Sequence, residues 1–339
     1  MNDSAQSAVT LQPSEYYLLR LRPPPDNYLL LGIALFVFSA ANLVIYGVVQ
    51  IAVKRIATRH HTFILLFSHG IADIGFLTQM VWLSLEIIFQ YRLLVPLKLD
   101  TFMLRLFGRS SNYHYLMIAL NRAHSLLFPF SYTHFWNRRR SVIVSSLLCW
   151  ALGTLHSIYV VYIFEVDDKA RVIHMPSVLS FSLIDVTAKG GEASTRLEKI
   201  LQGIVAIPTI LVYIIISFGL LWTRITKSSS VKSTSTSQPR KDPEGRIRLF
   251  VICFLSTVPT AIVYVIGYVI PQTPPYGSYA ASVSYVIAYS ASAHFLLSIS
   301  SLVRKYLPFR LTNDSVQLFT QSASHGGEIR AIRLAPPFV

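Results

Sequence analysis

The chain has 339 residues, of which 53% are hydrophobic and 14% are charged, and its mean hydropathy is +0.49. A soluble domain usually carries about 25% charged residues, so this composition excludes an ordinary water-soluble protein. The net charge of +14 lies in short clusters between apolar runs, which argues against nucleic-acid binding. Cys149 and Cys253 lie inside apolar runs and exclude a disulfide framework or a four-cysteine metal site.

Seven apolar runs follow a polar amino-terminal segment, residues 1–27, that has no signal-peptide core. A helix that crosses a bilayer needs about 20 largely apolar residues. The predicted spans are about 28–53, 62–89, 102–127, 141–164, 200–222, 247–270 and 279–303, and the tail is 304–339. The second, third and seventh runs are diluted by charges or serines, so a six-span protein is the alternative.

Lysine and arginine mark alternate loops, and such residues collect on the cytoplasmic side of membrane proteins. They follow the first, third, fifth and seventh runs: Lys54, Arg55 and Arg59; Arg138, Arg139 and Arg140; Arg224 to Arg246; and Arg304, Lys305 and Arg310. The other loops are balanced or uncharged. The sequence therefore predicts an all-α membrane protein, a seven-transmembrane helix bundle with the amino terminus outside and the carboxyl terminus inside.

Three polar residues in the first, second and seventh runs lie at a similar depth. Asn42, Asp73 and His294 are about 15 to 17 Å from the inner ends of their helices at roughly 1.5 Å per residue. With Ser298 they are predicted to share an intramembrane hydrogen-bond network. It is either a latch that rearranges on switching or a static network that holds the helices together.

Arg105 and Arg109 lie one turn apart in the outer half of the third run. Arg105 is expected to snorkel to the headgroups, whereas Arg109 is expected to pair with Glu86 or to bind an anionic group of a ligand. The positive charge hints at an acidic small molecule. Trp82, Tyr113 and Tyr264 are aromatic candidates for the lining of its cavity, although aromatic residues in spans are often packing residues. Pro208 and Pro259 are predicted to kink the fifth and sixth helices.

The stretch Leu120–Trp136 is the most specific motif. Its Arg122-to-Pro129 spacing matches the Asp-Arg-Tyr region of rhodopsin-like G-protein-coupled receptors, with Asn121 in place of the acid and Ala123 in place of the tyrosine. Leu120, Asn121, Arg122, Pro129, Tyr132 and Trp136 more closely resemble the signature of nematode serpentine chemoreceptors, particularly class gamma.

This resemblance implies a chemosensory receptor in the plasma membrane, such as that of sensory cilia, which couples a small-molecule ligand to a heterotrimeric G protein. It implies that Arg122 contacts the G protein or the inner helix ends, that Pro129 positions the loop, and that Asn42 and Asp73 form the rhodopsin-like polar pair. Asn121 and the basic run Arg138, Arg139 and Arg140 join the candidate coupling surface. The seventh helix lacks Asn-Pro-x-x-Tyr, and the sixth lacks Cys-Trp-x-Pro around Pro259.

Other functions are less well supported by the sequence. Catalytic histidine boxes and a Gly-x-Ser-x-Gly motif are missing, so no enzyme, cofactor or metal is expected. The seventh span has no lysine for a retinal Schiff base. An ion channel or transporter is the alternative to a receptor, because Asp73, Glu86, Arg105, Arg109 and His294 could line a conduction path.

Overall fold

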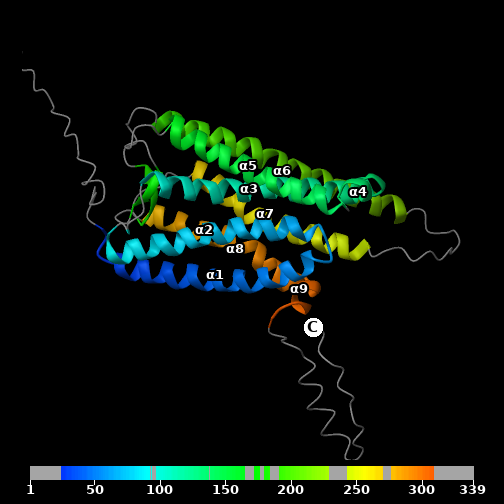
Figure 1. The fold of residues 1–339 in the computed structure, drawn as a ribbon, viewed down its shortest axis with the longest axis horizontal. Coiled ribbons are helices and arrows are strands. Elements are labelled where there is room, and N and C mark those ends of the chain that lie inside the picture. Colours follow the sequence, from blue (N-terminus) through cyan, green and yellow to red (C-terminus); the bar gives the residue numbers. More distant parts are fainter. Residues whose placement is uncertain are drawn as a thin grey trace, which may run out of the picture.

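A computed structural model describes residues 24–91, 93, 97–136, 138–164, 172–175, 179–183, 191–228, 243–269 and 276–308. Seven long helices dominate this part of the chain and run side by side (Figure 1). They are α1 (Tyr28–Ala57), α2 (Phe63–Phe89), α3 (Leu97–Leu127), α5 (Arg139–Tyr159), α6 (Gly191–Ser228), α7 (Pro243–Val269) and α8 (Tyr276–Ile299).

The long helices carry apolar side chains on their outer faces as well as in the core. Val44, Val144 and Phe218 are among the exposed hydrophobic residues. Helices suit this setting because each satisfies its own backbone hydrogen bonds where lipid offers none. Among the described helices, α1, α2, Arg139–Tyr162 and α8 are long and apolar enough to cross a membrane, and α6 and α7 contain the shorter apolar stretches Gly203–Gly219 and Leu249–Val263.

Several helix ends differ from the predicted spans, and α3, α6 and α8 show the reasons. Helix α3 begins at Leu97 rather than near residue 102, and α6 covers Gly191–Ser228 rather than 200–222. Hydropathy marks only the apolar part of a helix, so polar turns beyond the hydrocarbon were missed. The seventh helix ends at Ile299 rather than 303, because Ser300 is extended and its hydroxyl accepts a hydrogen bond from Val303 N.

Short elements lie at the two ends of the bundle (Figure 1). The antiparallel strands β1 (Val172–Met175) and β2 (Ser180–Leu183) lie at one end, where the Ser282 hydroxyl of α8 contacts Ser180 and Leu179. The helices α4 (Pro129–Phe135) and α9 (Ser301–Lys305) lie at the other end. The π-helical turn η2 (Val160–Phe164) extends α5. We call the second end the basic end, because it carries Lys54, Arg55, Arg59, Arg138, Arg139, Arg140, Arg304 and Lys305.

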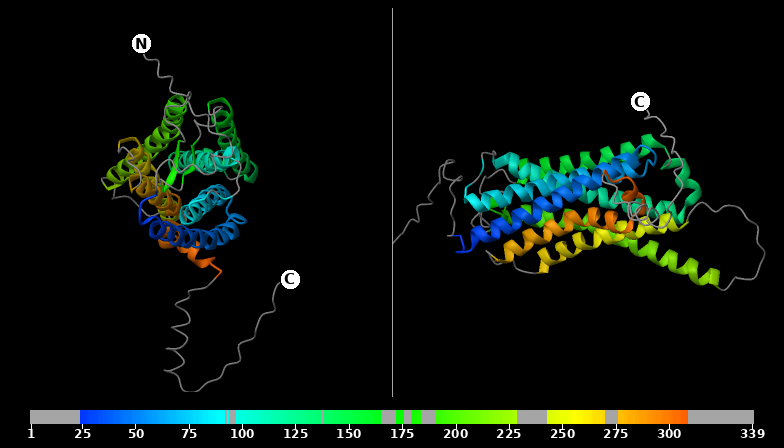
Figure 2. Two further views of the ribbon diagram at one scale, coloured as in Figure 1. Left: turned by 90° about the vertical axis from the view of Figure 1, so that its left-hand side faces the viewer. Right: turned by 90° about the horizontal axis from the view of Figure 1, so that it is seen from below.

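Helix α3 is central to the bundle, and it contacts α2, α5, α6 and α7. Helix α1 packs against α2 and α8, and α2 also contacts α8, so the first, second and seventh long helices are neighbours. The end-on view in Figure 2 shows the helices gathered around a common centre. Helices α6 and α7 remain helical through Pro208 and Pro259, so the predicted kinks at these prolines stay predictions.

Close packing of α5 on α3 depends on Gly153. A Cβ atom built there would overlap Ser110 Oγ and lie 2.9 Å from Ser110 N, so an alanine would force the two helices apart. We therefore expect Gly153→Ala to lower the thermal unfolding temperature of the purified protein. Gly47→Ala is the matched control, because nothing lies within 4 Å of its added Cβ and alanine favours helix by about 1 kcal/mol. Equal melting temperatures for both variants would contradict this account.

Candidate functional site

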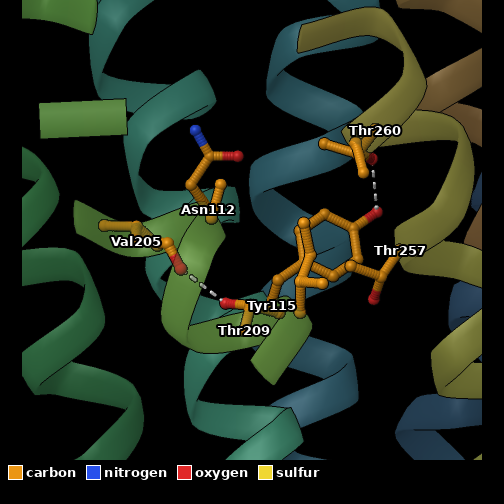
Figure 3. A pocket seen from close by; sticks show the side chains of 9 residues that line it. Asn112, Tyr115, Val205, Thr209, Thr257 and Thr260 are labelled. Atoms are coloured by element: carbon orange, nitrogen blue, oxygen red, sulfur yellow. Dashed lines mark hydrogen bonds between the residues drawn. The ribbon is translucent and has the colours of Figure 1, made fainter. Parts of the chain in front are cut away.

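A cavity lies between α3, α6 and α7 and encloses about 330 Å³ when its open mouth is included. Because this figure includes open solvent, the enclosed part is much smaller than an ordinary ligand pocket of about 300–1,000 Å³, and it fits a polar group whose attached chain extends into the mouth. Its wall is formed by Asn112, Tyr115, Val205, Ala206, Thr209, Ile210, Thr257, Thr260 and Ala261. Figure 3 shows Asn112, Tyr115 and Thr260 converging on this space.

The polar side chains of the wall differ in whether they have a hydrogen-bond partner. The Thr209 and Thr257 hydroxyls donate to their own helices, at 2.7 Å to Val205 O and 2.9 Å to Cys253 O. The Asn112 side chain is only 6% exposed. Its Oδ1 has no hydrogen-bond partner among the described residues. Because a buried polar atom left unpaired is costly, Asn112 Oδ1 is the natural anchoring point for a ligand.

Tyr115 connects the cavity to the interior of the bundle. Its hydroxyl accepts a hydrogen bond from Thr260 at 3.4 Å. Its ring lies edge-on against the His69 imidazole, with centroids 4.3 Å apart. His69 Nδ1 in turn lies 3.4 Å from Asp73 Oδ2. A ligand that moves Tyr115 would therefore act on His69 and Asp73 through direct contacts.

Asp73 is fully buried and gathers hydroxyl groups from three other helices. Its Oδ2 accepts from Tyr46 of α1 at 2.6 Å and from Ser292 of α8 at 3.2 Å, and its Oδ1 accepts from Ser111 of α3 at 2.6 Å. The Tyr46 and Ser292 hydroxyls also contact each other at 2.5 Å. We call Tyr46, His69, Asp73, Ser111 and Ser292 the Asp73 network.

The structure divides the predicted intramembrane network into separate parts. His294 Nε2 lies 2.8 Å from Asn42 Oδ1, so these two residues do form a pair between α1 and α8. Asp73 instead accepts a hydrogen bond from Ser292 of α8. Ser292 and His294 are about 200° apart around this helix, so His294 faces away from Asp73. Ser298 is exposed, and its carbonyl accepts a hydrogen bond from Arg304.

The predicted charged ligand site lies outside the cavity wall. The Glu86 carboxylate accepts hydrogen bonds from Trp82 Nε1 and Leu93 N, both at 3.1 Å. Arg105 and Arg109 are buried and act electrostatically on His156 of α5, while Arg109 also acts on Tyr113. Burial of Arg105 is contrary to the expected snorkelling. The ion pair between Arg109 and Glu86 stays a prediction, and the Tyr264 side chain lies outside the described residues.

At the basic end, Asn121 and Arg122 are buried in α3. The Arg122 guanidinium acts electrostatically on Tyr213 of α6 and Cys253 of α7. Within the described part of the chain, Arg122 Nε and both amide atoms of Asn121 have no hydrogen-bond partner. The motif thus places one unsatisfied polar atom, Arg122 Nε, near α6 and α7, while Asn121 lies on the face of α3 that also carries His114, seven residues earlier.

Pro129 was predicted to lie in a loop, but it begins helix α4, where proline's fixed φ and missing N–H suit the first turn. Trp136 Nε1 donates to His124 Nδ1 at 3.0 Å, which holds the end of α4 against α3. Phe128, Phe130 and Phe135 remain exposed, Phe130 by 87%. The exposed Arg138, Arg139 and Arg140 follow directly. This end therefore presents an apolar and basic surface next to Arg122.

Sequence reasoning missed the cavity wall and most of the Asp73 network. Threonine and serine are common in membrane helices, where they bond to the carbonyl four residues earlier and give little signal. The available signal was the run of polar residues in the middle of the third span: Ser110, Ser111, Asn112 and His114. His114 also bonds to Ser68 of α2 at 2.9 Å, and Ser68 is shared with Ser146 and Trp150 of α5.

Comparison with known proteins identifies the fold. No protein-family model matches the sequence, and no curated protein matches it. The chain is similar to the crystal structure of squid rhodopsin, with a TM-score of 0.68 and 15% sequence identity over 97% of this chain and 94% of that one. At this identity the likeness speaks for the fold alone. The chain therefore has the seven-helix fold of squid rhodopsin.

Proposed function

We propose that this protein is a G-protein-coupled receptor of chemosensory type, which binds a small molecule within the helix bundle and activates a heterotrimeric G protein. The observation that carries the proposal is the burial of Arg122 among α3, α6 and α7 at the basic end of a rhodopsin-like bundle. The basic end is the cytoplasmic side, because positive residues collect there. The amino terminus then lies outside and the carboxyl tail inside.

The unsatisfied Nε atom of the buried Arg122 supports a switching role for this end. Each buried polar group without a partner costs about 1–3 kcal/mol. A state in which α6 or α7 moves aside, and in which the G protein supplies carbonyl or carboxylate acceptors, would recover this cost. The motif would thus favour the partner-bound arrangement once a ligand permits it.

The cavity between α3, α6 and α7 is the proposed ligand site. It supplies an unpaired acceptor at Asn112, and Tyr115 connects it to the Asp73 network. The resemblance to class gamma chemoreceptors supports a chemosensory role and a location in the plasma membrane of sensory cilia. Arg105, Arg109 and Glu86, with Trp82 and Tyr113, remain candidates for a second, outer contact with the ligand.

The first test combines topology with coupling in one cell line. Antibody access to tags at each end of intact cells should show an external amino terminus and an internal carboxyl tail. A panel of small acidic and neutral volatile compounds should then yield guanine-nucleotide exchange on a co-expressed G protein. Both tags on one side, or ligand-evoked current without G protein, would transfer support to the channel or transporter alternative.

Phe130 gives a separate test of the partner surface. We expect Phe130→Ala to reduce G-protein activation about tenfold while cell-surface expression stays unchanged, because an 87% exposed phenylalanine supports no core and large apolar anchors dominate many interfaces. Val144→Ala is the matched control, since Val144 is also exposed but lies on the outer face of α5. Equal activation by the two variants would show that α4 does not contact the partner.

A further inference from the structure

The cavity between α3, α6 and α7 opens sideways rather than toward an end of the bundle. Its inner wall is buried, with Asn112, Tyr115 and Thr209 all less than a tenth exposed. Its outer wall contains Ile210, which is 41% exposed. The adjacent Ile207 and Ile262 are exposed apolar residues on α6 and α7. The mouth therefore lies on the face that these helices turn to lipid.

The arrangement of the helices explains this opening. Helices α6 and α7 each pack against α3, but their backbones approach each other closely at few positions. Toward the basic end the space between them is filled by aromatic rings, with Tyr213 centred 5.6 Å from Phe254 and 5.9 Å from Phe250. These rings form a floor, and the cavity lies on the opposite side of it, level with Thr209 and Thr257.

The wall also specifies the chemistry of the ligand. None of the described residues around the cavity carries a charge. Asn112 Oδ1 is an unpaired acceptor, and the hydroxyl protons of Thr209 and Thr257 are already committed to backbone carbonyls. The wall thus offers the ligand an unpaired acceptor at Asn112 Oδ1, beside the N–H donors of the same amide. Among the described wall residues a carboxylate would be buried without a cation, and an ammonium group without a carboxylate, so both carry a large desolvation cost.

We propose that this cavity takes a small, neutral, lipophilic molecule with one hydroxyl group, which enters from the bilayer between α6 and α7 and donates its hydrogen bond to Asn112. The proposal names the ligand class of the receptor site and so rests on the proposed function. It differs from the acidic ligand that Arg105 and Arg109 suggested, because neither arginine lines this cavity. Its apolar chain would lie against Ala206, Ile210 and Ala261.

The test uses the full-length protein in lipid nanodiscs and a photoactivatable octanol that carries a diazirine. Mass spectrometry of the labelled peptides should place the label on the cavity segments of α3, α6 and α7. Asn112→Leu should reduce this labelling about fivefold or more through loss of the acceptor. Ala261→Phe and Ala206→Phe should block the mouth from either helix, whereas Val144→Phe, on the exposed face of α5, should leave labelling unchanged.

Competition with unlabelled probes tests the ligand class. Octan-1-ol should suppress the label at least about tenfold more effectively than octanoate or octylammonium, because the wall offers no counter-ion to either. Equal competition by octanoate, or labelling that Asn112→Leu and both phenylalanine variants leave unchanged, would overturn the proposal. Thermal unfolding of each variant checks that it is folded.

The labelling needs no G protein, so the two proposals fail separately. Cavity labelling with the expected competition would support the ligand class even if no G protein were activated, and the receptor function alone would then be wrong. G-protein activation by hydroxyl compounds without cavity labelling would sustain the receptor and overturn the site.

Discussion

Replacement of Arg122 by alanine is expected to abolish ligand-evoked G-protein activation while the protein still reaches the cell surface. The guanidinium is only 5% exposed and acts electrostatically on Tyr213 of α6 and Cys253 of α7, so its positive charge lies near the two helices that enclose the cavity. Its Nε has no partner among the described residues. Removal of the side chain therefore costs the fold little hydrogen bonding, but it removes the charge that the partner would engage.

The measurement is guanine-nucleotide exchange on the co-expressed G protein, normalised to surface expression. Lys54→Ala removes a cation from an exposed position at the basic end and is the matched control. It should retain most of the activity. Arg122→Lys keeps the positive charge but loses the planar guanidinium group with its several N–H donors, and it should show intermediate activity. Full activation by Arg122→Ala would refute the coupling role and leave Arg122 as a helix-end anchor.

The number and order of the helices could be predicted because lipid demands long apolar runs. The starts of α1, α2 and α5 lie within two residues of the predicted ones, since each begins where an apolar run begins. The end of α8 was missed because Leu302 and Val303 continue the apolar run, although Ser300 breaks the helix. Hydropathy measures solubility in lipid, whereas a serine cap is a local backbone interaction.

The site was less predictable because depth is not enough to define contacts. Asn42 and His294 lie at the same depth and do contact each other. Asp73 lies at that depth too, but the orientation of α8 places Ser292, and not His294, against it. Tyr46 lies one turn after Asn42, but nothing in a single sequence shows which way α1 faces. Rotation of each helix about its axis comes from packing, such as Gly153 against Ser110, and this information is distributed over the whole bundle.

The Asp73 network gives the second large effect, and it is tested first through stability. Asp73→Ala should remove the acceptor that Tyr46, Ser111 and Ser292 share, although Tyr46 and Ser292 still contact each other and Ser111 still contacts His69. Three lost hydrogen bonds at about 0.5–1.5 kcal/mol each amount to a few kcal/mol, and we expect a clearly smaller amount of folded protein at the cell surface. Asp73→Asn keeps the volume and one acceptor oxygen, so it should fold with a moderately lower thermal unfolding temperature.

Activation by Asp73→Asn distinguishes a latch from a static network. In the latch hypothesis, a ligand that moves Tyr115 acts on His69 and then on the carboxylate that connects α1, α3 and α8. Loss of one hydrogen bond, worth about 0.5–1.5 kcal/mol, should raise the ligand concentration for half-activation by about twofold to tenfold. Unchanged activation in a folded Asp73→Asn protein would mean that the network only holds the helices together.

Double-mutant cycles identify which contacts carry the effect. Tyr46→Phe and Ser292→Ala should each be non-additive with Asp73→Asn, because all three side chains share hydrogen bonds. Ser284→Ala is the matched control on α8, since the hydroxyl of the half-buried Ser284 bonds within its own helix to Ala280 O. Its effect should simply add to that of Asp73→Asn. If Ser292→Ala were equally additive, the contact between α8 and Asp73 would carry no coupling, and the latch would have to act through Ser111 on α3.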